Sequence, residues 1–357
     1  MKVCILGDGL TSLTLAKALV NLNVYVDIFS EKKNSIYSQT RTLGISKSNV
    51  DFFNKNIINF EKILWKLKKI EIFSENLKKE NLLNFENDNN YLFSTVKNYD
   101  LYELLIKDLN KNKYYKKKLY RGKSLSFINE YDLIINCDYF HHITKKYFNK
   151  KIVKEYNSRA YTTIIKHENI LNDSAIQIFT KRGPLAFLPI SDTQTSVVYS
   201  LHNLFFSKKE NISLLINKYN FKYKIQKIQK IQSFELKSLN LRSYFHKNIL
   251  AFGDLLHRVH PLAGQGFNMT IRDIKLLSEI IQNRANLGLP LDVSVCLDFE
   301  KKIRHKNYVF SNGIDFIHEF FNFERKTNMN VLSKSVKFLG KNYSLNKLFT
   351  KIADRGL

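Results

Sequence analysis

The chain has 357 residues, a formal net charge of +25 and a hydrophobic content of 44%. This length suggests two interlocked domains, and this apolar content excludes wholesale disorder. The 57 lysines and arginines are scattered over most of the sequence without an RNA-binding or zinc-finger motif, so we expect no nucleic-acid partner.

The cysteines predict neither disulfides nor a metal site. Cys4, Cys137 and Cys296 are far apart and outside any CxxC or Cys/His spacing, which is typical of buried thiols in a reducing compartment. No window approaches the roughly 18 apolar residues of a membrane-spanning helix. The sequence opens directly into an apolar strand, which predicts no signal peptide. We therefore expect a cytoplasmic protein whose basic surface can contact the inner face of the cytoplasmic membrane peripherally.

The N-terminal residues predict a βαβ unit. Residues 2–6 indicate a buried strand, residues 10–22 have helical apolar spacing, and residues 24–29 alternate as a second strand does. The turn GDGLTS follows the first strand and carries Gly7 and Gly9. These glycines permit a tight turn and bring a pyrophosphate close to the backbone at a helix N-terminus. The alternative is an ordinary βα turn.

The same motif sets expectations for neighbouring residues. Ser12 replaces the third glycine and is small enough for close helix–strand packing, and Leu10 belongs to the same predicted phosphate-binding turn. The motif also requires an acid at the end of the second strand for the ribose hydroxyls. Ser30 holds the expected position, whereas Glu31 is the chemically better partner but follows on the opposite strand face. Both residues stay candidates.

Beyond this unit the predicted elements change in kind. Residues 99–118 predict an amphipathic helix, and residues 131–138 predict a strand that ends in an acidic residue. The stretch 76–90 is rich in Asn, Lys and Glu and predicts a solvated loop or irregular helix. From about residue 293 the chain is predicted to be mostly helical. Four segments in the middle predict consecutive strands of a largely antiparallel sheet: 160–166, 175–180, 185–190 and 195–201.

Residues 249–281 carry the most specific pattern. A buried strand delivers Gly253 and Asp254, and a loop with one proline and two glycines leads to a helix that begins near Asn268. Such a site can hold a polyol through the acid and a polar ring edge through backbone amides. The segment GDLLHRVHPLAGQGFNMTIRD resembles, nearly position for position, the GD…HP…GQG.N…D pattern of the group A flavoprotein monooxygenases, and within them of the ubiquinone-biosynthesis hydroxylases (UbiH-like).

Three further segments resemble the same family. QTRTLGIS (39–46) resembles its arginine-containing stretch, TKRGPLAFLPI (180–190) its GP.A..P strand pair, and FEKKIRHKN (299–307) its helix with acid, arginine and asparagine. The resemblance implies an α/β fold with a Rossmann-type FAD-binding domain, like that of para-hydroxybenzoate hydroxylase, an interleaved antiparallel substrate domain and C-terminal helices. The implied segments are FAD-binding parts at 1–75, 99–150 and 246–290, a connecting segment at 76–98, the substrate-binding sheet at 151–245 and the helical region at 291–357.

The resemblance also implies roles for single residues. Asp254 is expected to bind the ribityl chain of FAD, Gly7 and Gly9 the pyrophosphate, and Arg41 the flavin. The residues expected to contact the cofactor are Gly7, Gly9, Leu10, Ser12, Ser30, Glu31, Arg41, Asp138, Gly253, Asp254, Pro261, Gly264, Gln265, Gly266, Phe267 and Asn268. Those expected to act on flavin or substrate are His260, Pro261 and Gln265. We expect His257 to be structural and no metal to be bound.

One motif departs from the family. The family has a strand followed by Asp-Gly and usually Ser and Arg, which contact both FAD and the nicotinamide cofactor. Here Asp138 is retained, but Tyr139 holds the glycine position, and Lys145 or Lys146 must stand in for the arginine. A side chain at this position blocks close backbone approach. This departure weakens the expectation of reduction by NAD(P)H more than that of FAD binding.

The activity that the resemblance implies is that of an FAD-dependent monooxygenase. In the family, NAD(P)H reduces the flavin, O2 forms a flavin C4a-hydroperoxide, and this species hydroxylates a phenol ring. The implied substrate is a polyprenyl phenol of ubiquinone biosynthesis, and the strands at 185–190 and 195–201 either line its site or form plain core. The alternatives are another oxidoreductase of this fold, such as a prenyl reductase or a hydroxylase of another aromatic, and a catalytically impaired flavin-binding partner in a quinone-synthesis complex. Residues 331–357 alternate apolar residues with lysines, which indicates a helix packed on the body or a contact with an anionic membrane.

Overall fold

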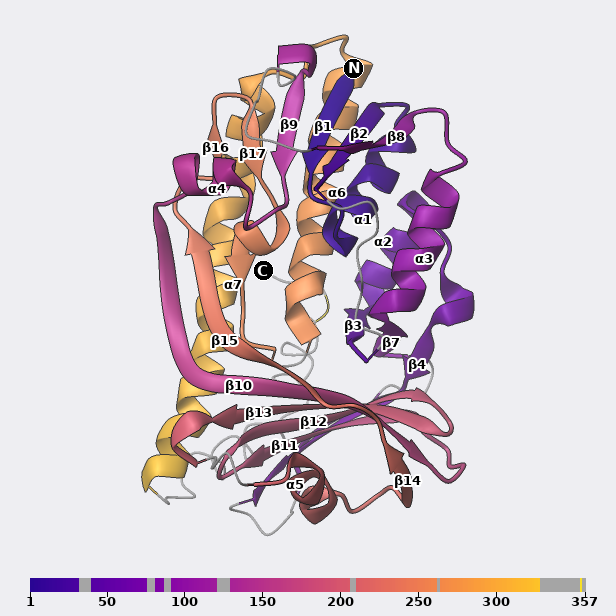
Figure 1. The fold of residues 1–357 in the computed structure, drawn as a ribbon, viewed down its shortest axis with the longest axis vertical. Helices are drawn as coiled ribbons and strands as arrows, with labels where there is room; N and C mark the ends of the chain where they lie inside the picture. The colour runs from indigo at the N-terminus through magenta and orange to yellow at the C-terminus, as the bar shows by residue number, and fades with distance from the viewer. Residues whose placement is uncertain are drawn as a thin grey trace.

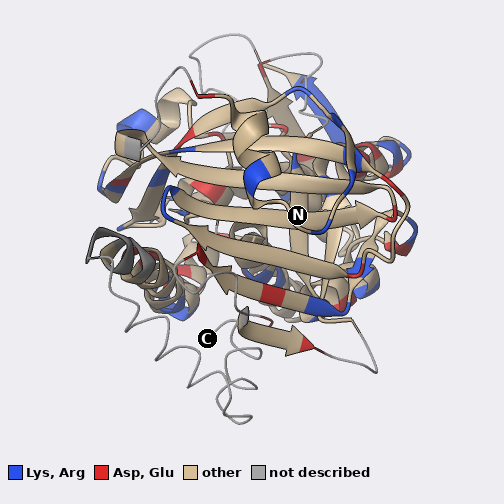
Figure 2. Ribbon diagram, turned by 90° about the horizontal axis from the view of Figure 1, so that it is seen from below, with Lys and Arg blue, Asp and Glu red and all other residues tan. Residues whose placement is uncertain are grey.

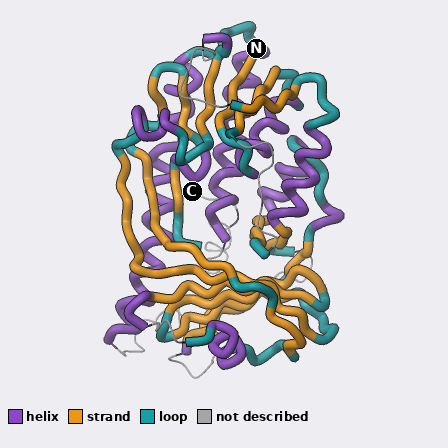
Figure 3. The backbone as a smooth tube through the Cα atoms, viewed as in Figure 1, coloured by secondary structure: helices purple, strands orange, loops and turns teal. Residues whose placement is uncertain are grey.

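The computed structural model describes residues 1–31, 40–75, 81–86, 91–120, 129–205, 210–261, 264–327 and 354. These residues form two layers, an upper one of parallel strands flanked by helices and a lower one built on a large sheet (Figure 1). Figure 3 shows that helices gather around the upper sheet, whereas strands dominate the bottom of the molecule. This is the α/β architecture with an interleaved sheet that the sequence predicts.

The upper sheet has the strand order β16-β17-β9-β1-β2-β8. Neighbouring strands from β17 to β8 are parallel, and β16 pairs with β17 in the antiparallel sense. β1 and β9 are almost wholly buried, which is why they read as continuous apolar runs. The bounds are β1 Lys2–Leu6, β2 Tyr25–Ser30, β8 Tyr115–Leu119, β9 Leu133–Asn136, β16 Phe245–His246 and β17 Ile249–Ala251.

The chain order makes the carboxyl end of β1 the natural ligand site of this sheet. After β1 the chain passes through α1 to β2 on one side, while β9 pairs with the other side of β1. Open α/β sheets bind ligands at such a switch point. The helices of this layer are α1 Leu10–Val20, α2 Lys47–Asn56, α3 Asn98–Leu109, α4 His142–Tyr147 and α6 Gln265–Asn286.

The lower sheet has the order β18-β15-β10-β13-β12-β11-β5-β6, with β14 beside β10. The four strands predicted in the middle of the chain are confirmed, and they pair antiparallel, while β5 joins β11 in parallel. The bounds are β5 Lys69–Ser74, β6 Asn81–Glu86, β10 Lys151–His167, β11 Ser174–Thr180, β12 Gly183–Ser191, β13 Gln194–His202, β14 Ile225–Ile228, β15 Gln232–Leu241 and β18 His257–Arg258. The predicted segment boundaries stay a prediction, although β5 places residues 69–74 in the lower sheet.

The two faces of the lower sheet differ because successive side chains alternate. Leu185, Phe187 and Tyr199 point into a core closed by α5 (Ile212–Tyr219). Phe179 points the other way and packs against residues of α6 and α7 (Val293–Thr327). By alternation and cross-strand register, the half-buried residues on this inner face also include Gln177, Ala186 and Val198.

A small third sheet and a long helix join the layers. β3 (Thr42–Ser46) and β4 (Trp65–Leu67) both pair with β7 (Phe93–Lys97). In Figure 1 this sheet lies between the upper helices and the lower sheet, while α7 runs down the opposite side of the molecule. The remaining short helices are η1 Glu61–Ile63, η4 Asn203–Phe205 and η5 Gly253–Leu255.

Three predicted elements need correction. The helix predicted at 99–118 ends at Leu109. Tyr115–Leu119 (YKKKL) form strand β8 instead, because these residues pair with β2 at the edge of the upper sheet. The helix predicted to begin near Asn268 begins at Gln265, since Gly264 adopts the left-handed conformation (φ +64°) as its N-cap. Residues 81–86 of the predicted loop form the edge strand β6. The predicted C-terminal helix is confirmed to Thr327; except for Asp354, residues 331–357 lie outside the described residues.

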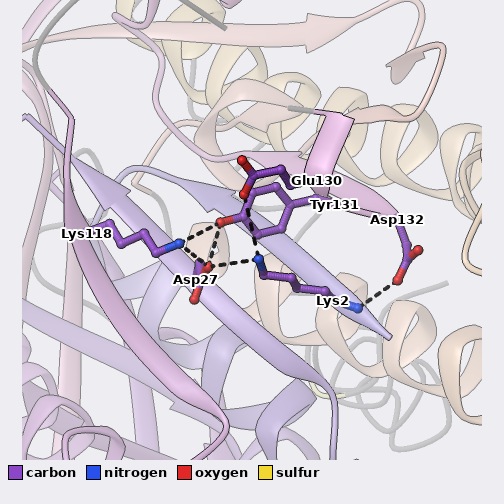
Figure 4. Close-up of polar contacts among 6 residues, drawn as sticks. All are labelled: Lys2, Asp27, Lys118, Glu130, Tyr131 and Asp132. Atoms are coloured by element: carbon purple, nitrogen blue, oxygen red, sulfur yellow. Dashed lines mark hydrogen bonds and ion pairs between the residues drawn. The ribbon is translucent and has the colours of Figure 1, made fainter. Parts of the chain in front are cut away.

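A buried carboxylate ties the edge of the upper sheet together (Figure 4). Asp27 on β2 accepts from Lys118 Nζ at 2.7 Å and Tyr131 Oη at 2.5 Å, and Lys2 Nζ lies 3.8 Å away. Burial raises the pKa of Asp27, but the Lys118 and Tyr131 hydrogen bonds outweigh it and hold the pKa below its ordinary value. Figure 2 shows that other Lys and Arg residues are distributed over several elements at the rim of the lower sheet.

Candidate functional site

The two glycine-bearing turns predicted to grip one ligand meet at the carboxyl end of β1. Gly7 has φ +95°, and a Cβ on it would lie 3.2 Å from the Cβ of Asp138, which follows β9. Gly253 has φ +65°, and a Cβ on it would lie 2.7 Å from Thr11 Cγ2 in the first turn of α1. Three strand ends, those of β1, β9 and β17, therefore converge on one helix N-terminus.

The Gly7–Gly9 turn fits an anionic group. Gly9 is the N-cap of α1, and among the described residues no atom lies within 4 Å of where its Cβ would stand. The first turn of a helix presents unsatisfied N–H groups and a partial positive charge. The absence of a side chain at Gly9 therefore leaves room for the pyrophosphate that is predicted there; of the neighbouring predicted contacts, Leu10 is half-buried and Ser12 is buried.

The predicted ribose-binding residues lie at the end of β2, where a third residue joins them. Ser30 is buried and its Oγ donates to Asp8 at 2.9 Å, whereas Glu31 is exposed one residue beyond the strand. Asp8 Oδ2 also accepts from Lys117 Nζ on β8 at 2.9 Å. The glycine motif gives no signal for Asp8, because this residue stands between the two glycines at a position that the motif leaves open.

Asp254 reaches solvent from the end of β17. Its residue is exposed at the start of the turn Gly253–Leu255. Burial, and then the charges of Asp138 and Asp254, raise the pKa of the Cys137 thiol to about 12. The Asp254 carboxylate thus lies near the end of β9, on the same edge as the Gly7–Gly9 turn, where the ribityl chain of FAD is expected.

The start of α6 is locked to β3 through Asn268. Its Nδ2 donates to the carbonyls of Gly44 at 3.0 Å and Gly264 at 3.1 Å. Its Oδ1 accepts from Ser46 N at 2.9 Å and Asn49 Nδ2 at 2.8 Å. The protein thus uses the whole side-chain amide of Asn268 to hold this loop against β3, and the cofactor contact predicted for Asn268 stays a prediction.

Other residues of this loop keep the capacity to meet a ligand. Gln265 is 6% exposed, and its Oε1 has no hydrogen-bond partner among the described residues. Leaving such an atom unsatisfied costs roughly 1–3 kcal/mol, which a bound polar ring edge would relieve. Gly266 is exposed, and Pro261 and Phe267 are half-buried. Arg41 is exposed immediately before β3, whose Gly44 lies 3.5 Å from where a Cβ of Gly264 would stand.

The two histidines before Pro261 have different surroundings. His257 Nε2 lies 2.5 Å from Asp273 Oδ2 in the core, as expected of a structural residue. His260 is 1% exposed, and its ring contacts Tyr156 of β10 and His318 of α7 at centroid distances of 4.9 and 4.3 Å. Neither ring nitrogen of His260 has a hydrogen-bond partner among the described residues, and burial lowers its pKa well below the usual value.

Tyr139 fills the position where the family has glycine. Asp138 accepts from Phe140 N at 2.8 Å, which holds the turn after β9. The Tyr139 hydroxyl accepts from Lys151 Nζ at 2.9 Å, and the Arg258 guanidinium lies 5.0 Å from its ring centroid. The Lys151 hydrogen bond lowers the pKa of Tyr139. A cationic pair therefore holds the ring against the end of β18.

Among the described residues, no group of three His, Cys, Asp or Glu residues is placed to hold a metal ion. Within the same ranges, no helix combines the length and apolar character needed to cross a membrane.

Several known proteins resemble this chain in sequence. Residues 206–285 match the FAD binding domain family. The chain is 27% identical over 165 residues to the Escherichia coli 3-demethoxyubiquinol 3-hydroxylase, which is 44% of this chain and 42% of that protein. It is 21% identical over 276 residues to the Schizosaccharomyces pombe ubiquinone biosynthesis monooxygenase COQ6, which is 63% of this chain and 57% of that protein. The chain therefore spans about half the length of these curated relatives.

Solved structures match nearly the whole chain. The p-nitrophenol 4-monooxygenase PnpA of Pseudomonas putida has a TM-score of 0.80 and 11% identity, covering 99% of this chain and 98% of its own. Klebsiella pneumoniae HpxO, complexed with FAD and uric acid, has a TM-score of 0.77 and 10% identity, covering 99% and 97%. At such low identity the likeness shows the fold alone. Residues 206–285 thus match an FAD binding domain family, and the chain has the fold of the FAD-dependent monooxygenases, as the motif around Asp254 predicts.

Proposed function

We propose that this protein is an FAD-dependent monooxygenase that hydroxylates the aromatic ring of a polyprenyl phenol in ubiquinone biosynthesis, using NAD(P)H and O2. The observation that carries the proposal is the meeting of the Gly7–Gly9 turn with the Gly253–Asp254 turn at the carboxyl end of β1. The names of both curated relatives refer to ubiquinol hydroxylation or ubiquinone biosynthesis, which supports the substrate class.

Each part of FAD has candidate partners in this arrangement. Gly7, Gly9 and the first turn of α1 would hold the pyrophosphate, and Asp254 would bind the ribityl hydroxyls. Gln265 and the adjoining backbone would meet the polar edge of the isoalloxazine. Bound FAD supplies the oxygen-activating chemistry. The chain itself contributes binding, orientation and a dry environment.

The inner face of the lower sheet is the surface we propose for the aromatic substrate. Ala186, Val198 and Gln177 are half-buried on the face opposite the α5 core. The bulky Phe187 and Tyr199 point into that core and are therefore unavailable to a substrate. The small apolar side chains of Ala186 and Val198 suit a flat ring and help to exclude water from it.

Reconstitution tests the proposal directly. The purified protein should retain FAD, and a polyprenyl phenol should stimulate NAD(P)H consumption with matching O2 uptake and a hydroxylated product. Failure to bind FAD would refute the proposal. FAD binding without substrate-stimulated turnover would support the second candidate, a catalytically impaired flavin-binding partner in a quinone-synthesis complex.

Tyr139 is the observation that favours this second candidate. Its ring stands where the family keeps a glycine, and Lys151 and Arg258 hold it there. Replacing Tyr139 by Gly should raise the rate at which NAD(P)H reduces the bound flavin if the ring obstructs the nicotinamide. An unchanged rate would remove the case for obstruction. The matched control is Tyr139→Phe, which keeps the ring and loses only the hydroxyl.

A peripheral membrane contact is a separate part of the proposal. The formal net charge of +25 favours anionic lipid headgroups, and residues 331–357 alternate lysines with apolar residues. Co-sedimentation with liposomes should increase with the fraction of anionic lipid and fall when residues 331–357 are deleted. Equal co-sedimentation in both comparisons would refute this part alone.

A further inference from the structure

The acid expected at the end of β2 is missing, and neither neighbouring candidate replaces it well. Ser30 holds the position, but its hydroxyl is buried and donates to Asp8. Glu31 lies one residue beyond the strand. Burial of Tyr120, which follows β8, raises the pKa of that tyrosine, and the charge of Glu31 raises it further. Glu31 thus lies near Tyr120, where β8 ends.

A carboxylate nevertheless lies at the end of β2, supplied by a different part of the chain. Asp8 stands in the turn after β1, and Gly7 N donates to Phe29 O at 2.8 Å, which holds this turn against β2. From there the Asp8 side chain reaches the Ser30 hydroxyl. The Asp8 side chain is 13% exposed, so it borders solvent at the same edge as the Gly7–Gly9 turn.

Lys117 makes a carboxylate tolerable beside a pyrophosphate. Its Nζ lies 2.9 Å from Asp8 Oδ2, and its side chain is 23% exposed. Without this partner, a negative Asp8 would repel an anion bound at Gly7 and Gly9. A carboxylate accepts hydrogen bonds at about four positions, so a ribose hydroxyl can share the Asp8 carboxylate with Ser30 and Lys117.

We propose that Asp8, held by Ser30 and Lys117, is the acid that binds the adenosine ribose hydroxyls, in place of a residue at the end of β2. This inference rests on the proposed FAD binding and deepens it. The ligand class is an adenine nucleotide with a free ribose 2′-hydroxyl. Lys117 lies on β8, outside the glycine motif, and this strand is held beside β2 by their pairing. Binding of the ribose by Asp8 would therefore depend on the strand order of the sheet.

Binding measurements on the full chain separate Asp8 from its rival Glu31. Asp8→Asn should weaken FAD binding roughly ten- to hundred-fold, because a charged hydrogen bond is lost. It should not weaken FMN binding, since FMN has no adenosine half. The matched control, Glu31→Gln, makes the same acid-to-amide change and should alter FAD binding less than about two-fold. The reverse ranking of the two variants would overturn the inference.

A ligand pair tests the same contact without relying on a variant that folds. Wild-type apoprotein should bind ADP more tightly than 2′-deoxy-ADP, and Asp8→Asn should lose this preference. Equal affinities in the wild type would refute the ribose contact while FAD binding itself could still be observed. If the wild type binds no FAD, the proposed function fails first.

The role of Lys117 follows from a double-variant comparison. Lys117→Met alone should weaken FAD binding, because it leaves Asp8 uncompensated near the pyrophosphate. The double variant Asp8→Asn with Lys117→Met should bind FAD more tightly than the sum of the single losses predicts. Strictly additive losses would show that the two side chains act independently and would contradict the charge compensation.

Discussion

Gly253 lies against Thr11 so closely that a Cβ on the glycine would stand 2.7 Å from Thr11 Cγ2. The two residues are far apart in sequence, one after β17 and the other in the first turn of α1. Their contact brings the Asp254 carboxylate to the helix N-terminus that follows β1. The candidate FAD site exists only because these segments meet.

Replacing Gly253 by Ala should damage both stability and FAD retention. A left-handed conformation in a residue with a side chain and the crowding of Thr11 together should cost about 2–4 kcal/mol of unfolding free energy. Gly288 is the matched control, since it has the same φ of +65° with no atom within 4 Å of its Cβ position among the described residues. Gly288→Ala should cost only about 1 kcal/mol and leave FAD content unchanged. Urea unfolding and flavin absorbance would check both, and equal effects would contradict the packing argument.

Asp254→Ala should weaken FAD retention at least roughly ten-fold, because a charged acceptor for the ribityl hydroxyls is removed. The exposed Asp254 is not needed for the core, so the unfolding free energy of the apoprotein should change little. Asp298→Ala is the control, since that carboxylate pairs with Arg284 on the surface. Flavin content after gel filtration measures the effect. Normal content in Asp254→Ala would remove this residue from the site.

The Asp27 network should stabilise the fold in a defined pH range. The folded-state pKa of Asp27 lies below its ordinary value, so its contribution is complete above the unfolded pKa of about 3.9 and is lost as pH falls through the folded pKa. Asp27→Asn should lower the unfolding free energy at pH 7 by about 1–3 kcal/mol, and this difference should shrink below pH 4. Asp51→Asn, in the exposed pair with Lys47, should cost at most about 0.5 kcal/mol. A pH-independent loss at Asp27 would contradict the charge-based explanation.

His260 should make the protein sensitive to mild acid. Burial lowers its folded-state pKa, so the stability present above the unfolded pKa of about 6.5 is lost as pH falls towards the folded pKa, by up to about 1.4 kcal/mol per pH unit. His260→Phe keeps a ring between Tyr156 and His318 and should flatten the decline between pH 6.5 and 5. His141, whose pKa burial lowers to about 4, adds a decline that remains in the variant.

Chemical denaturation at several pH values measures this difference. Replacing the exposed His305 by Phe provides the control and should leave the pH dependence unchanged. If His260→Phe declines as steeply as the wild type, the histidine is not responsible for the acid sensitivity.

Short-range patterns explain most of what could be predicted. The strand, glycine turn and helix at the N-terminus are local features, and so is the segment around Asp254, so their types follow from neighbouring residues. Helix and strand are harder to separate where a short polar strand follows a helix. The sequence therefore predicts a helix up to residue 118, although pairing with β2 makes Tyr115–Leu119 a strand.

The sequence alone determined the class of fold, the two glycine-bearing turns and the departure at Tyr139, because each depends on residue types at fixed local spacing. The tertiary structure decided which side chains share the site. Segments far apart in the chain are joined by the hydrogen bonds of Asp8 with Ser30 and Lys117, by those of Asn268, and by the contact of Gly253 with Thr11. Sequence spacing cannot specify such contacts, because strand order and register set the distances between those segments.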